Sequence, residues 1–287
     1  MQRIEITHTT LYRYAEPVRF LEHKLHVRPR EGHDIRIASS GLRINPAYKI
    51  TWQRDVYGNS VAIVSFEEPG DILEIVSTVV VEHYEEQVVS FALTEEAQQF
   101  PFTYDPMEQV DLVPYQASIY NEERTVLIDW LSGIWQPGTA IDTMSFLHLL
   151  NGRIARDIDY LVRDEPGVQP PATTLARGRG SCRDVATLFI EACRQYGLAS
   201  RFVSGYLVSS AAVEDLATTH AWAEVYLPGA GWRGFDSTSG QLVGGDHIAA
   251  AVHRHPEAIP PVSGRFVGPP DPQPRMEVSV RVKRLDD

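Results

Sequence analysis

Residues 180–197 read GSCRDVATLFIEACRQYG, a stretch with the pattern of a single helix. Its apolar side chains recur at the spacing of one helix face. They are Val185, Leu188, Phe189, Ala192, Cys193 and Tyr196. Gly197 follows directly, as a glycine does just beyond the C-terminus of a helix. The pattern predicts a buried helix that begins at Cys182, with that cysteine on the buried face.

The position of Cys182 has chemical consequences. Unpaired N–H groups and the positive end of the helix dipole favour a thiolate over a thiol. Arg177, Arg179 and Arg183 lie close in sequence and act in the same direction. The same N–H groups can stabilise an oxyanion that forms beside the sulfur. We therefore predict that Cys182 is a nucleophile, supported by Asp184 in the first helical turn, which suits the dipole and can orient nearby donors.

The second cysteine, Cys193, lies in the middle of the apolar stripe, where an inert packing role is expected. Eleven residues at about 1.5 Å each separate it from Cys182 by about 16 Å, beyond the reach of a disulfide. A chain with two cysteines and no disulfide framework indicates a reducing compartment. The N-terminus shows no apolar signal segment and no stretch approaches a membrane span, so a cytoplasmic location is expected.

A histidine and an aspartate lie on two predicted strands that follow the helix. His220 starts the strand that ends at Leu227, and Asp236 ends the strand that starts at Trp232. A hairpin register with Leu227 opposite Gly231 brings Asp236 to the face of the sheet that carries His220. A slip of one residue would send Asp236 to the other face. A cysteine nucleophile needs a base, and the base needs an acceptor that orients it, so this register predicts a Cys182–His220–Asp236 triad.

The rest of the chain divides by composition. Residues 1–89 are rich in alternating, strand-like runs and are predicted to form an all-β domain; one such run, Arg3–Tyr14, places Ile4, Ile6 and His8 on one face. Residues 90–287 are predicted to form a second domain that contains the Cys182 helix and a final strand. Its other predicted segments are a short helix at Thr94–Phe100, a loop to Tyr120, helices at Asn121–Ser132 and Asp142–Asp159, an irregular stretch at His255–Pro274 and a strand at Met276–Leu285.

The composition limits the classes of partner. The 287 residues include 43% hydrophobic and 22% charged residues, which is typical of a globular protein. The net charge of −12 argues against general binding to nucleic acid or to an anionic membrane.

The sequence offers little for a metal site. No calcium loop of the Asp-x-Asp-x-Asp-Gly type is present. A metal site built from His247, His253 and His255 is considered, but their spacing matches no strong zinc signature, so no cofactor is predicted.

Three blocks of sequence resemble the bacterial transglutaminase-like superfamily. They are Gly180–Asp184, Arg201–Leu207 and the run from Thr219 to Thr238, in matching order and spacing. The segments Asp246–Ile248 and Pro261–Gly264 are similar to the C-terminal part of that family, and residues 1–89 to its accessory β domain. Two stretches depart from the family pattern: Asp236-Ser237-Thr238 replaces the usual Asp-Pro-Thr, and Ala251–Pro260 differs from a segment often written Gly-Arg-Asp-Tyr.

The resemblance implies an α+β fold with a papain-like core, in which a central helix carrying the cysteine packs on an antiparallel sheet. It implies that Cys182 is the nucleophile, His220 the base and acid, and Asp236 the orienting carboxylate. Tyr160, Trp222 and Tyr206 are possible oxyanion donors, although packing roles are the simpler interpretation of each.

Three functions remain open. The first is thiol-dependent hydrolysis of a peptide or carboxamide through a thioester, and the second is transglutamination by the same triad. The third is a non-catalytic binding protein that retains the fold. We favour hydrolysis, with a peptide or protein as substrate. The sequence does not decide the oligomeric state or the role of the β domain.

Overall fold

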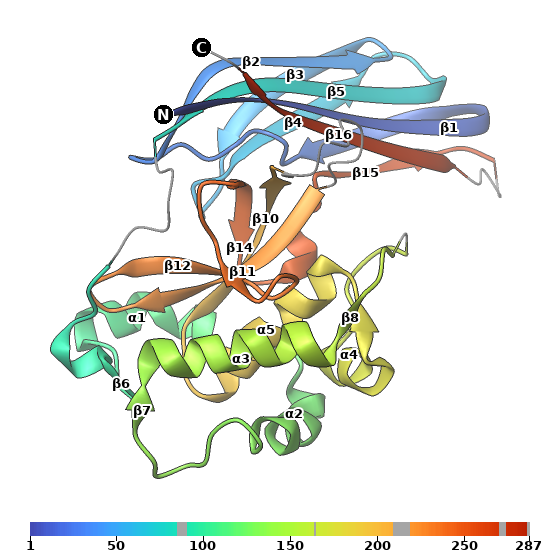
Figure 1. Cartoon of the computed structure of the whole chain (residues 1–287). Helices are drawn as coiled ribbons and strands as arrows, with labels where there is room; N and C mark the ends of the chain where they lie inside the picture. Colours follow the sequence, from blue (N-terminus) through green and yellow to red (C-terminus); the bar gives the residue numbers. More distant parts are fainter. Residues whose placement is uncertain (85–90, 164, 209–218, 270–273, 286–287) are drawn as a thin grey trace.

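The computed structural model describes residues 1–84, 91–163, 165–208, 219–269 and 274–285. It confirms the predicted α+β class. A broad antiparallel sheet forms one layer, a second antiparallel sheet lies beneath it, and helices cover the far side of the second sheet (Figure 1). No helix among the described residues is long and apolar enough to cross a membrane.

The upper sheet is built around one long strand, β1 (Gln2–Leu25). Its first half lies between β5 (Gly70–His83) and β16 (Arg275–Leu285), and its second half pairs with β4 (Ser60–Phe66) and β15 (Val262–Val267). Every second residue from Ile4 to Thr10 is buried, as the alternating pattern predicted. The remaining strands are β2 (Ile35–Asn45), paired with β5, and β3 (Tyr48–Arg54), paired with β4.

The C-terminal strand corrects the predicted division of the chain. Sequence analysis placed Met276–Leu285 in the second domain, but β16 pairs with β1 from Arg3↔Leu285 to Arg13↔Arg275 and completes the first sheet. The start of β1 and the end of β16 therefore lie side by side at the same end of that sheet (Figure 1). An alternating pattern reveals a strand but not its partner, which explains the error. The boundary predicted near residue 89 lies in 85–90, outside the described residues.

The stretch from His255 to Pro274 was predicted to be irregular, and part of it is regular. It contains a short 3-10 helix η3 (Pro256–Ala258) and the strand β15. In β15 no residue is fully buried and Gly264 interrupts the side-chain pattern, so the usual alternation is absent. Pairing with β1, more than 230 residues away in sequence, orders the strand instead.

The second sheet positions the candidate site. Its order is β13 (Gln241–Leu242), β12 (Gly231–Asp236), β11 (Thr219–Leu227), β10 (Ser200–Leu207) and β14 (His247–His253), and all its pairs are antiparallel. Helix α5 (Cys182–Gln195) packs on one face of this sheet, as predicted. The contact is tight, because the Phe189 ring stacks on Phe235 with 5.3 Å between centroids.

The other helices enclose α5. They are α1 (Pro106–Gln116), α2 (Arg124–Leu131), α3 (Thr143–Asp157) and α4 (Pro171–Arg177). Helix α1 corrects the predicted loop to Tyr120; its start signals are Asp105, which caps the Met107 amide, and Pro106 in the first position. The predicted helix at Thr94–Phe100 is only a 3-10 turn, η1 (Glu95–Ala97), because Thr94 makes no side-chain cap. Short pieces complete the fold: β6 (Gln99–Phe100), η2 (Asn121–Glu123), β7 (Ile141–Asp142), β8 (Asp159–Tyr160) and β9 (Arg179–Gly180).

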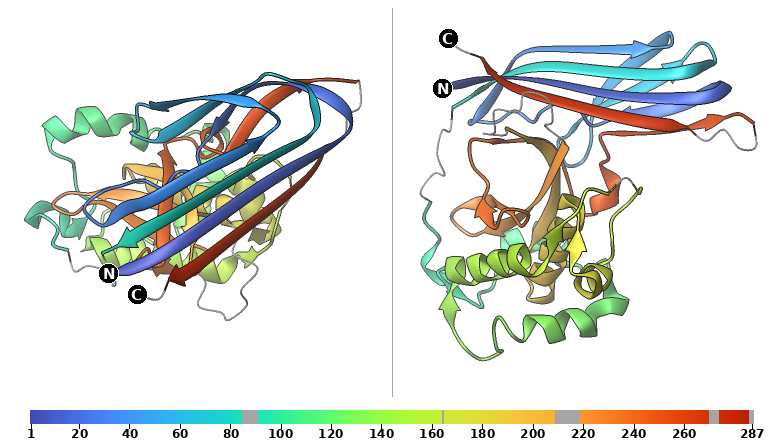
Figure 2. Two further views of the ribbon diagram at one scale, coloured as in Figure 1. Left: turned by 90° about the horizontal axis from the view of Figure 1, so that it is seen from above. Right: turned by 45° about the vertical axis from the view of Figure 1, so that its right-hand side comes forward.

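The two sheets share a buried interface. Tyr206, Ile248 and Ala250 of the lower sheet pack with Ile4 and Val79 of the upper sheet in one apolar cluster. Figure 2 shows the long upper strands lying across the lower sheet, on the side away from α3 and α5. The upper sheet is thus a direct neighbour of the face of the lower sheet that does not contact α5.

Candidate active site

Cys182 opens helix α5 and is 9% exposed. The start of the helix is held by a capping box. The Ser181 side chain accepts a hydrogen bond from the Asp184 backbone amide, and the Asp184 side chain accepts one from the Ser181 backbone amide. The Ser181 amide donates to Asp184 Oδ2 at 2.8 Å. This arrangement fixes the first turn, so the Cys182 sulfur occupies a defined position at the positive end of the helix dipole.

Asp184, predicted as a supporting residue, is fully buried and anchors the helix start to its surroundings. Its carboxylate accepts from the Gln169 amide at 2.7 Å and from the Arg163 guanidinium at 2.8 Å. Burial alone would raise the pKa of Asp184, but the hydrogen bonds from Gln169, Ser181 and Arg163 outweigh it and hold the pKa below its usual value. The residue therefore orients Cys182 through the backbone of the helix.

Replacing Asp184 with alanine should destabilise the protein by about 3 kcal/mol, because it removes the buried partner of the Arg163 guanidinium and the capping box. Urea unfolding followed by circular dichroism measures this loss. Asp142→Ala is a matched control: Asp142 caps α3 through the Ser145 amide but is exposed, so its loss should cost about 1 kcal/mol. Equal losses in the two variants would contradict the anchoring role of Asp184.

The hairpin between β11 and β12 has the register that the triad requires. Leu227 lies opposite Gly231, as predicted, and Ala223 lies opposite Phe235. The loop between the strands holds three residues. Gly229 and Gly231 both have a positive φ, which residues with a side chain rarely adopt. Phe235 faces α5, so its neighbour Asp236 lies on the other face of the sheet, with His220.

The structure brings the three predicted residues together. His220 Nε2 lies 3.0 Å from Asp236 Oδ2, and Cys182 is close enough to His220 to help raise its pKa. Because Nε2 is engaged with Asp236, Nδ1 is the ring nitrogen left to interact with the sulfur. Burial lowers the pKa of His220, but Asp236 and Cys182 outweigh it and raise this pKa to about 9. Hydrogen bonds from His220 and His247 hold the pKa of Asp236 far below its usual value despite burial.

A second histidine at this carboxylate was missed as a site residue by the sequence analysis. His247 Nε2 lies 3.3 Å from Asp236 Oδ2, so two imidazoles share one oxygen. Sequence analysis weighed His247 only for a metal site with His253 and His255, but His253 lies at the opposite end of β14, against the Tyr57 ring. The available signal was the Asp246–Ile248 segment, which matched the family pattern but carried no assigned role.

The three possible oxyanion donors occupy different environments. The Tyr206 hydroxyl donates to the Val27 carbonyl at 3.1 Å and lies 3.1 Å from His8, so it belongs to the interface between the sheets. Trp222 is 1% exposed and packs beside His220, and its Nε1 has no partner among the described residues. Tyr160 is 51% exposed and close enough to Cys182 for the cysteine to raise its pKa, although burial is the larger cause.

Cys193 lies near the C-terminal end of α5, away from the histidine and the carboxylate around Cys182. It is fully buried on α5, and burial raises its pKa well above the usual range of a thiol. A thiol that stays protonated is a poor nucleophile. The structure agrees with the packing role that sequence analysis gave this residue.

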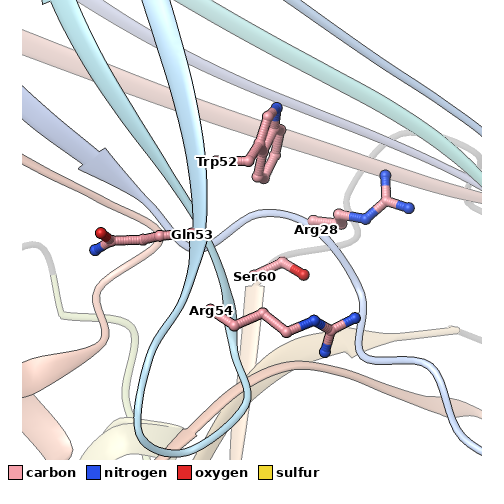
Figure 3. Close-up of a pocket in the computed structure, with 5 residues that line it drawn as sticks. All are labelled: Arg28, Trp52, Gln53, Arg54 and Ser60. Carbon is pink, nitrogen blue, oxygen red and sulfur yellow. The ribbon is translucent and has the colours of Figure 1, made fainter.

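A shallow pocket of about 350 Å³ lies elsewhere, on the upper sheet (Figure 3). Its lining residues are Arg28, Trp52, Gln53, Arg54 and Ser60. Both guanidiniums already bond the protein itself, Arg28 to the Ser40 hydroxyl and Arg54 to the Gly58 carbonyl. We assign no chemistry to this pocket, because it contains none of the hydrogen-bonded groups around Cys182.

Comparisons with known proteins place both parts of the chain. Residues 4–82 match the bacterial transglutaminase-like N-terminal region, and residues 139–237 match the transglutaminase-like superfamily. An uncharacterized protein of Mycobacterium tuberculosis is 27% identical over 297 residues, covering 91% of this chain and 87% of its own length. A second uncharacterized protein, from Mycobacterium leprae, is 24% identical and covers 93% and 94%.

One solved structure shares the whole architecture. It is a Cytophaga hutchinsonii protein described as a candidate cysteine protease, with a TM-score of 0.74 and 19% identity, and the match covers 100% of this chain and 91% of that one. At this level of identity the likeness shows the fold alone.

Proposed function

Because this chain belongs to the transglutaminase-like superfamily, we propose that it catalyses thiol-dependent acyl transfer on peptide or carboxamide substrates. The observation that carries the proposal is the convergence of three side chains: His220 Nε2 lies 3.0 Å from Asp236 Oδ2, and Cys182 is close enough to His220 to help raise its pKa. A nucleophile, a base and an orienting acceptor in contact are the parts that covalent acyl transfer requires. A binding protein has no need for this arrangement.

In the proposed reaction the Cys182 thiolate attacks the carbonyl carbon of the substrate, and the carbonyl electron pair moves onto oxygen. The backbone N–H groups at the start of α5 face the developing negative charge. Protonated His220 then gives its proton to the leaving ammonia or amine as the C–N bond breaks, which leaves a thioester on Cys182. A water molecule, deprotonated by His220, attacks the thioester and releases the acid.

Asp236 stays ionised throughout. It holds His220 in one orientation and stabilises the imidazolium, which explains the raised pKa of His220. At neutral pH His220 is therefore mostly imidazolium and can protonate the leaving group. We favour hydrolysis over amine transfer, since water needs no acceptor site of its own.

The surroundings of Cys182 suggest which substrates to test first. Tyr160 pairs with Gly180 in the parallel β8–β9 contact, and the Leu161 amide donates to the Gly180 carbonyl at 2.8 Å. Tyr160, Leu161 and Val162 are all exposed, and Gly180, which pairs with Tyr160, lies two residues before the nucleophile. Exposed apolar side chains beside a nucleophile favour substrates with apolar residues next to the reacting carbonyl.

Mass spectrometry of such peptide amides tests the proposal. The peptides are incubated with the protein, with and without a primary amine, and Cys182→Ala serves as the control. A mass increase of about 1 Da from amide to acid, or cleavage of the peptide, indicates hydrolysis, whereas incorporation of the amine indicates the alternative, transglutamination. Products that form equally with Cys182→Ala would overturn the proposal.

A further inference from the structure

We propose that His247 is a positioning residue that holds Asp236 in place, and that the upper sheet acts on the site through it. The inference rests on the proposed function, since it concerns the orientation of the same carboxylate. It also assigns the accessory sheet a specific role: the upper sheet secures β14, the strand that His247 begins.

The backbone around His247 determines which ring nitrogen carries the proton. Residues 244–247 form a tight turn, in which the His247 amide donates to the Gly244 carbonyl at 2.9 Å. The Gly244 amide in turn points at His247 Nδ1, with a long distance of 3.5 Å. Nδ1 is therefore the acceptor, and Nε2 carries the hydrogen that is donated to Asp236 Oδ2. A neutral His247 is thus sufficient to hold the carboxylate.

The carboxylate is fixed from three sides. Oδ2 accepts from His220 at 3.0 Å and from His247 at 3.3 Å, and Oδ1 accepts from the Thr238 amide at 2.9 Å. The Trp222 ring meets His247 edge-on, with centroids 5.2 Å apart, and it also lies beside His220. Both carboxylate oxygens are hydrogen-bonded, and the Trp222 ring packs beside the two histidines. Rotation of the Asp236 carboxylate away from His220 would therefore break its hydrogen bond with His247.

Three contacts from the upper sheet and its connections secure β14. Arg284 of β16 pairs with Asp246, the residue before His247, at 2.5 Å. The Arg30 amide donates to the Ala249 carbonyl at 2.8 Å. Asn59, fully buried in the β3–β4 turn, makes two bonds to the Val252 backbone, one as donor at 2.8 Å and one as acceptor at 2.9 Å. These contacts run from Asp246, next to His247, to Val252 near the other end of β14, so they hold the whole strand that carries the histidine.

The contacts predict how substitutions at His247 act. His247→Phe keeps a planar ring but removes the donor, and we expect kcat to fall 10- to 100-fold, as is usual when a group that orients a site residue is lost. KM should stay within twofold, because His247 is not proposed to touch substrate. His247→Gln restores an N–H donor and should recover most of kcat. His253→Gln, at the other end of the same strand, is the matched control and should match the wild type.

A double-mutant cycle tests the link to the upper sheet. Asn59→Ala should lower kcat threefold or more in the wild-type background and have little further effect in His247→Phe. All rates are measured below the thermal unfolding midpoint of every variant. Additive effects of the two substitutions would overturn the link, and wild-type kcat in His247→Phe would overturn the positioning role.

A chelator tests the alternative that these side chains bind a metal. Loss of wild-type activity in a chelator, with recovery on adding Zn²⁺, would overturn the positioning role of His247, because His220, Asp236 and His247 would then hold a metal.

The rate of Cys182 alkylation by iodoacetamide separates this inference from the proposed function. If Cys182 reacts no faster than a model thiol in the wild type, the proposed function fails. If Cys182 reacts fast and His247→Phe leaves both this rate and kcat unchanged, only the role of His247 fails. A reduced rate in His247→Phe that His247→Gln restores supports the inference, since a merely structural residue would not require an N–H donor.

Discussion

Replacing Cys182 with alanine should abolish turnover, with a loss of at least about 10⁴-fold. The substitution removes the atom that forms the thioester, and nothing else at the site supplies a nucleophile at the same point. The helix should remain intact, because alanine is a good helix former and the capping box of Ser181 and Asp184 does not involve the sulfur. Turnover of a peptide amide and labelling by iodoacetamide measure the two consequences.

Cys193→Ala is the matched control for this substitution. Both cysteines lie on α5, but Cys193 is fully buried and its pKa is raised, so it should neither label in the native protein nor affect turnover directly. The wild type should take up one equivalent of iodoacetamide and Cys182→Ala none. Labelling of Cys193 in the native protein, or full turnover by Cys182→Ala, would contradict the assignment.

The central part of the site was predictable because its signals are local. Residues 180–197 contain the whole helix pattern and its cap, and the three-residue loop after Leu227 sets the hairpin register on its own. Once that register is known, the alternation of side chains places Asp236 on the same face as His220. The placement of Asp236 and His220 on one face of the sheet can therefore be predicted from local sequence alone.

The parts that sequence analysis missed depend on distant partners. Strands β15 and β16 are ordered by β1, at the other end of the chain, and no local pattern names that partner. His247 reaches Asp236 only because β14 pairs with β10 at the edge of the sheet. A single histidine in a strand is most often a structural residue, so its role appears only when the fold brings it to a carboxylate.

If His247 positions Asp236 as proposed, the N-terminal region supports the site through β14. The turn at Asn59 is 161 residues from His220 in sequence, yet it bonds β14, the strand that begins with His247. His8 of β1 is also buried in the interface, where burial lowers its pKa to about 4 and keeps it neutral against Tyr206. A neutral histidine at this buried position adds no charge to the apolar cluster between the sheets.

Replacing Asp236 with asparagine should lower kcat by about 10⁴-fold, although the side chain keeps its size. The amide loses the negative charge that raises the pKa of His220, so this pKa falls from about 9. A larger fraction of the imidazole is then neutral at a given pH, which weakens its support of Cys182. The amide also presents an N–H₂ group, which favours the wrong orientation of His220. The pH dependence of kcat and of alkylation by iodoacetamide measures both changes.

The pH dependence of stability provides an independent check on the same pair. The folded pKa of His220 is raised above 6.5, so its stabilising contribution is complete below pH 6.5 and is lost as the pH rises through about 9. The pKa of Asp236 is lowered, so its contribution is present at neutral pH and is lost only as the pH falls into the acid range. Asp236→Asn should flatten the profile at both ends, whereas Asp157→Asn, which changes an aspartate on α3 paired with Arg153, should leave the alkaline end unchanged. An alkaline loss of stability that persists in Asp236→Asn would show that the charge pair of His220 and Asp236 is not its cause.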